Sequence, residues 1–112
     1  VDGTAVLAVG APRGKAYTAP DWERAAAAAP AYRQGDYASA AATLQAALDE
    51  HPESVGVLYN LACCEALIGQ RDDALVHLRR ALRAAPDLAA HARADSDLDS
   101  IRDDPRFAAA IA

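Results

Sequence analysis

The residues of this sequence that most often do chemistry in proteins are few and widely scattered. Its three histidines lie in three different segments, without the short spacing of a zinc site. They are His51, His77 and His91, and we interpret them as solvent-exposed or helix-end residues. The two cysteines, Cys63 and Cys64, are adjacent, which suits neither a disulfide framework nor a metal-ligand pattern. We therefore expect reduced thiols in a cytoplasmic setting.

An acidic stretch near the C-terminus superficially resembles a calcium-binding loop. Its carboxylates alternate with serine and leucine, and they are Asp95, Asp97, Asp99, Asp103 and Asp104. The glycine and the final bidentate glutamate that such a loop requires are missing. We predict instead that these residues cap helices and face solvent, and that the chain uses no metal and no cofactor.

The remaining candidates for chemistry are equally incomplete. Gly10, Gly14 and Lys15 suggest a phosphate-binding loop, but the full spacing and the Ser or Thr after the lysine are lacking. No serine or cysteine can be matched with a histidine as nucleophile and base. We therefore predict that this chain is not an enzyme.

Length and charge restrict the class of partner. The 112 residues provide room for one domain, and the formal charge is −5. Because acidic and basic residues are interspersed, we expect no nucleic-acid partner and no anionic membrane surface. No apolar run is long enough to cross a bilayer. A protein or peptide partner is the expectation that remains.

Helices must position these residues, and a period of 34 residues organises them. Small, apolar and punctuating residues recur at this shift, while the unmatched positions are mostly polar. The matched pairs are Ala28 and Ala62, Gly35 and Gly69, Ala40 and Ala74, Leu44 and Leu78, Ala47 and Ala81, Leu48 and Leu82, and Pro52 and Pro86. Chance does not easily produce this pattern, which is typical of units that share their packing.

Each unit predicts two helices joined at a glycine. Gly69 follows a periodic apolar stretch, where a left-handed C-cap favours glycine, so we expect a helix over about 54–68. Asp72 favours the start of the next helix, which Pro86 ends. In the earlier unit Pro30 interrupts the first helix, and we expect a kink or break there.

The strings GDYASAAATLQAALDEHP and LYNLACCEALIGQRDDALVHLRRALRAAP closely resemble the tetratricopeptide repeat family. The resemblance covers about residues 21–88. It implies an all-α fold in which antiparallel helix pairs build a right-handed superhelix, with repeats at about 21–54 and 55–88.

The C-terminal tail, 89–112, departs from a full repeat. Asp103 replaces the turn glycine and Pro105 interrupts the pattern. An end repeat needs a cap over its apolar face, so we predict short capping helices from Leu88 to Ala94 and from Pro105 to Ile111. The helical domain then spans 18–112, after an extended N-terminal segment or linker at 1–17.

The N-terminal segment supports an alternative function. Thr4 to Val9 are β-branched and aliphatic, which predicts a strand and then a loop. The phrase DGTAVLAVGAPRGKAYTAPDWE resembles the last strand and exit segment of small cupin-like barrels. This resemblance implies that the helices are a structural or dimerisation appendage of a longer protein with a metal-binding barrel. A homodimer through this strand would be its sign.

The principal hypothesis is a protein–protein interaction scaffold. The family resemblance implies a concave groove, lined by the first helix of each repeat, in which a partner peptide binds. The groove residues that we predict are Trp22, Tyr32, Arg33, Tyr59, Asn60, Cys63, Leu67 and Arg93. The aromatic side chains would add contact area and Asn60 would bond a peptide backbone, although ordinary packing between repeats is the alternative role of each aromatic residue.

Some members of this family hold the C-terminal carboxylates of chaperones with a clamp of Lys, Asn and Arg. Asn60 matches the asparagine of that clamp. Alanines stand where its other polar and basic residues would be, namely Ala25, Ala29, Ala90 and Ala94. We therefore predict no carboxylate clamp.

Overall fold

The computed structural model describes residues 23–112, and these residues form helices throughout. With η marking 3-10 helices, the elements in chain order are η2 (Ala26–Ala28), α2 (Ala29–Arg33), α3 (Tyr37–Glu50), α4 (Val55–Leu67), α5 (Arg71–Ala84), α6 (Leu88–Ala94), η3 (Ser96–Ile101) and α7 (Pro105–Ile111). No β-strand occurs among the described residues, so the all-α prediction is confirmed there. The strand predicted from Thr4 to Val9 lies outside them, and so does Trp22.

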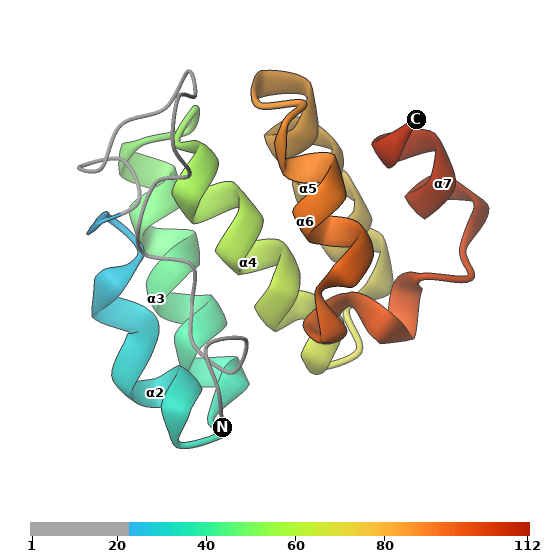
Figure 1. Cartoon of the computed structure of the whole chain (residues 1–112). Coiled ribbons are helices and arrows are strands. Elements are labelled where there is room, and N and C mark those ends of the chain that lie inside the picture. Colours follow the sequence, from blue (N-terminus) through green and yellow to red (C-terminus); the bar gives the residue numbers. More distant parts are fainter. Residues whose placement is uncertain (1–22) are drawn as a thin grey trace.

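The helices follow one another as antiparallel pairs. In Figure 1, α2 and α3 lie at one edge, α4 occupies the middle, α6 lies in front of α5, and α7 forms the opposite edge. Helix α4 packs against both α3 and α5, and α5 packs against α7. The successive pairs are therefore α2 with α3, α4 with α5, and α6 and η3 with α7.

Local sequence signals account for most helix ends. The Asp36 side chain accepts a hydrogen bond from the Ser39 amide at 3.2 Å and caps α3, and Ser54 Oγ accepts one from the Val57 amide at 3.3 Å and caps α4. Gly35 and Gly69 have φ angles of 80° and 86°, the left-handed conformation that favours glycine after a helix. The two glycine turns predicted from the sequence are confirmed.

The break that we expected at Pro30 lies just before this residue. Helix α2 begins at Ala29 with Pro30 in its first turn, and the single 3-10 turn of η2 precedes it. A proline in the first turn costs no hydrogen bond, because that backbone amide has no partner within the helix in any case. The chain therefore starts a new helix there, and α2 is shorter than its counterpart α4.

The core is built around α4, in which every residue from Val55 to Ala66 is buried. Leu44 of α3, Leu61 of α4 and Leu78 of α5 are at most 1 % exposed. Burying one such leucine contributes about 1.5–3 kcal/mol. The helix is apolar on all sides because neighbouring elements surround it, and its position accounts for the alanines and leucines conserved in phase between the units.

One charged residue lies within this core and has a partner. Oε1 of Glu65 on α4 lies 2.7 Å from Nδ1 of His77 on α5, and the His77 side chain is largely buried. Our expectation that His77 is solvent-exposed or at a helix end is therefore wrong. Its imidazole provides the contact that a buried carboxylate requires.

The C-terminal region is a more complete third unit than the sequence indicated. The capping helices expected from Leu88 to Ala94 and from Pro105 to Ile111 are present as α6 and α7. Between them η3 packs against α4. At a shift of 34 residues, α6 and η3 together correspond to α4, interrupted at Asp95, which has extended backbone angles. No helix within 23–112 is long and apolar enough to span a bilayer.

Candidate functional site

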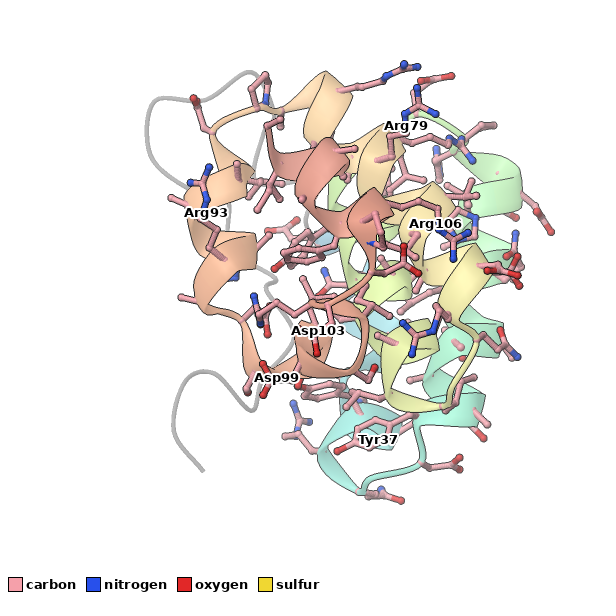
Figure 2. All side chains as sticks on the ribbon, turned by 90° about the vertical axis from the view of Figure 1, so that its right-hand side faces the viewer. Tyr37, Arg79, Arg93, Asp99, Asp103 and Arg106 are labelled. Carbon is pink, nitrogen blue, oxygen red and sulfur yellow. The ribbon has the colours of Figure 1, made fainter. Side chains whose placement is uncertain are left out.

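The predicted groove residues fall into two groups by burial. Tyr32, Tyr59, Asn60 and Cys63 are at most 4 % exposed. Arg33 and Arg93 are exposed and Leu67 is half-buried. Figure 2 shows Arg93 at the outer edge of α6. The surface of the predicted groove is therefore provided by the second group, and the first group lies beneath it.

Tyr32 connects the first unit to the third. Its hydroxyl on α2 donates a hydrogen bond to Oδ2 of Asp97 on η3. The ring of Tyr37 lies against that of Tyr32, with 5.5 Å between centroids. Because Cys63 occupies the corresponding position of the second unit, this bond passes over α4 and closes one end of the face that the first helices form.

Tyr59 makes the second connection, between α4 and the break in the third unit. Its hydroxyl donates a hydrogen bond to Oδ2 of Asp95 at 2.7 Å. The Cys63 sulfur lies 3.7 Å from the same oxygen, and Nε2 of His91 lies 3.6 Å from it. Oδ1 of Asp95 accepts the Asp97 amide at 3.0 Å and so caps η3. Both oxygens of this carboxylate are therefore hydrogen-bonded.

We call these five residues the tyrosine–aspartate cluster: Tyr32, Tyr59, Cys63, Asp95 and Asp97. Burial is the main cause that raises the pKa of both tyrosines far above their ordinary value, and the aspartates add to it. Burial also raises the pKa of Asp97, against the lowering effect of the Tyr32 hydrogen bond. At neutral pH the tyrosines are thus hydrogen-bond donors to carboxylates, and not bases or nucleophiles.

Burial likewise governs the two cysteines. It raises the pKa of the Cys63 thiol well above its ordinary value and that of Cys64 to about 12. A thiolate is the nucleophilic form of cysteine, and neither residue favours it. The cysteines are therefore buried neutral side chains that fill space between helices.

Three atoms of the cluster are close enough to be compared with a metal site. The Cys63 sulfur and carboxylate oxygens of Asp95 and Asp97 lie within 4.8 Å of one another. Each carboxylate already accepts a tyrosine hydroxyl, and zinc requires a deprotonated thiol, which burial disfavours here. This donor set does not fit a metal ion, and it fits a network of structural hydrogen bonds.

Arg102 holds η3 in place against the end of α6. Its guanidinium donates to the Arg93 carbonyl and the Asp95 carbonyl, both at 2.7 Å, and lies 5.2 Å from the centroid of the Phe107 ring. Ser100 Oγ donates to the Ala66 carbonyl at 3.0 Å and ties η3 to α4. The carboxylates of the cluster are thereby fixed in position.

Sequence reasoning missed the role of Asp95 and Asp97. The prediction that the acidic stretch caps helices is confirmed for Asp95 and for Asp104, which accepts the Arg106 amide at 2.9 Å and caps α7. The prediction that the stretch faces solvent is wrong for Asp95 and Asp97, which are half-buried. The signal was available, because Asp97 falls 34 residues after Cys63, at a position that faces the first helices.

Comparison with known proteins gives one match. A family model described as tetratricopeptide repeat matches residues 31–98, more than half of the chain. The matched span includes all five residues of the cluster. Neither a search of curated proteins nor one of solved structures gave a match. No finding supports the cupin-like resemblance of the N-terminal segment.

Proposed function

We propose a protein-binding function for this chain, which belongs to the tetratricopeptide repeat family. Repeats of this family generally mediate protein–protein interaction. We infer that the partner is a peptide segment that lies along the face of the first helices, α2, α4 and α6. The proposal gives no catalytic role to the chain.

The observation that carries the proposal is the pair of hydrogen bonds within the tyrosine–aspartate cluster. Tyr32 and Asp97 connect the first unit to the third, and Tyr59 and Asp95 connect the second to the third. These bonds hold the first helices in one arrangement before any partner binds. A preorganised surface loses little conformational entropy on binding, which favours affinity.

The burial pattern assigns different roles to the predicted groove residues. Arg33, Leu67 and Arg93 keep exposed surface, and in this proposal they contact the partner. Two arginines on this face favour a peptide with carboxylates, because exposed opposite charges speed association and set orientation. Tyr32, Tyr59 and Cys63 support the face from beneath.

Asn60 belongs to the supporting group. Its amide nitrogen donates to the Gly56 carbonyl at 2.8 Å, and the side chain is 1 % exposed. A clamp asparagine has to present its amide to a peptide carboxylate, and this amide is used within α4. The contact supports our prediction that the chain has no carboxylate clamp.

The test is selection of a peptide from an unbiased random library displayed on phage, with the 112-residue chain as the target. The selected peptide is labelled, and its affinity is measured for the Arg33→Glu and Arg93→Glu variants. We expect each reversal to weaken binding roughly tenfold. Arg80→Glu is the matched control, because Arg80 lies on α5 and donates to the Pro52 carbonyl. Equal affinity for all four proteins would contradict the proposal.

A further inference from the structure

A second surface lies between α5 and α7, in the layer of second helices. A groove there is lined by apolar and basic side chains from both helices. Those used in the argument are Val76, Arg79, Leu82, Arg83, Arg106 and Ala109. In Figure 2, Arg79 and Arg106 lie on one side of the molecule and Arg93 lies on the other. The groove is therefore separate from the face of the first helices.

The unequal lengths of the two helices produce this groove. Helix α5 has 14 residues and α7 has 7. They start side by side, because Arg106 Nη2 lies 3.0 Å from Asp72 Oδ1. At a shift of 34 residues Ala109 corresponds to Leu75, so α7 accompanies only the first half of α5. Within the described part of the chain, the outer side of the second half of α5 has no helix beside it.

The floor of the groove is apolar and partly open. Val76 is 55 % exposed, and no other large hydrophobic side chain is exposed within residues 23–112. Leu82 lies deeper, at 4 % exposed, and the small side chain of Ala109 forms the opposite wall. Small residues on one helix allow a neighbouring helix to approach closely. An apolar partner side chain would cover Val76.

The rim of the groove is basic and available for pairing. Arg79 and Arg83 are exposed, and among the described residues neither makes a hydrogen bond or an ion pair. Arg106, in contrast, is held by Asp104 and Asp72. Arginines near the C-terminal end of a helix suit its macrodipole, but the macrodipole does not account for the exposed valine beside them. A positive rim on a chain of net charge −5 indicates an acidic partner.

We propose that this groove docks an acidic amphipathic helix of a partner protein. The apolar stripe of that helix lies on Val76, Leu82 and Ala109, and its carboxylates pair with Arg79 and Arg83. A helix suits the groove better than an extended peptide, because the backbone groups of α5 and α7 are already bonded within their helices and offer no ladder to a strand. The inference does not depend on the function proposed for the first-helix face.

The test uses three synthetic stapled helical peptides and the 112-residue chain. The first carries a leucine stripe flanked by glutamates, the second has lysines in place of the glutamates, and the third is a scrambled form of the first. Binding is measured by fluorescence anisotropy at low and high salt. We expect the acidic helix to bind roughly tenfold more tightly than the lysine helix, and to weaken as salt screens the rim.

Variants of the chain locate the binding surface. The Arg79→Glu/Arg83→Glu double variant and Val76→Glu should each lose roughly tenfold or more in affinity for the acidic helix. Arg80→Glu is the matched control, since it makes the same charge reversal on α5 and should leave the affinity unchanged. Circular dichroism melting checks that each variant is folded.

Three results would overturn the inference. The first is the absence of binding by the acidic helix at about 1 mM, and the second is equal binding of the acidic and lysine helices. The third is a dimer in light scattering that the Arg79→Glu/Arg83→Glu substitution dissociates, because the occupant would then be a second copy of this chain. None of these results bears on the first-helix face, which the phage-selected peptide tests separately.

Discussion

Tyr32 and Asp97, 65 residues apart, are joined by a hydrogen bond that runs from the first helix of the first repeat to that of the third. Repeat proteins are generally stabilised by contacts between neighbouring units only. Here a contact between non-neighbouring units adds to them. A chain with few repeats has a small core, and this bond contributes to holding it in one arrangement.

Replacing Tyr32 by phenylalanine should reduce the free energy of unfolding by about 1–3 kcal/mol, because the half-buried Asp97 carboxylate loses its donor. Urea unfolding measures the change. Tyr37→Phe is the control, since its hydroxyl makes no hydrogen bond within the described residues, and it should have little effect. Equal destabilisation by the two substitutions would show that the aromatic packing, and not the hydrogen bond, is what matters.

Asp104 should make stability fall in acid. Its hydrogen bonds to Arg106 lower the pKa of its carboxyl from 3.8 to about 2 in the folded chain. A carboxyl with a lowered folded pKa favours folding above the unfolded value, and this contribution disappears as pH falls through the folded value. Asp104→Asn should therefore be less stable than the native sequence above pH 3.8, with the difference vanishing near pH 2. A difference that stays constant with pH would rule out this linkage.

Cys63 and Cys64 should be protected from thiol reagents in the native state. Both are buried, and burial raises the pKa of Cys64 to about 12. Labelling with a chromogenic disulfide reagent should require unfolding, so its rate should rise steeply with urea. A Thr43→Cys variant places a thiol at an exposed position of α3 and should react at once. Rapid native labelling of Cys63 would contradict the burial on which the cluster depends.

Gly69 should be needed for its backbone conformation alone. Its φ is 86°, and a Cβ placed there would meet no atom within 4 Å. Gly69→Ala should therefore cost about 1 kcal/mol through the left-handed conformation, and Gly69→Asn should cost less because asparagine tolerates it. Thermal unfolding of the two variants distinguishes them. If asparagine costs as much as alanine, the loss has another cause.

The sequence predicted the features that depend on local patterns. Glycine turns, a helix restart near Pro30 and the two capping helices follow from residue types and the 34-residue shift. The interruption at Asp95 could not be found in this way, because its carboxylate is fixed by the Tyr59 hydroxyl, 36 residues away. Contacts between distant residues have no signature in local periodicity.

The candidate site was predicted in outline but not in depth. The sequence placed Tyr32, Tyr59 and Cys63 on one face, and the structure brings all three into the cluster. What the sequence lacked was the third unit, whose aspartates cover these residues. Burial depends on which neighbour fills a position, and the degenerate third repeat concealed that neighbour.

Mapping the amide chemical-shift changes that the phage-selected peptide causes is the most direct test of the central claim. The account predicts that the shifted amides cluster on α2, α4 and α6, around Arg33, Leu67 and Arg93, and that Arg93→Glu reduces them. Shifts confined to α3, α5 and α7 would contradict it and would show that the face of the first helices is not the binding surface.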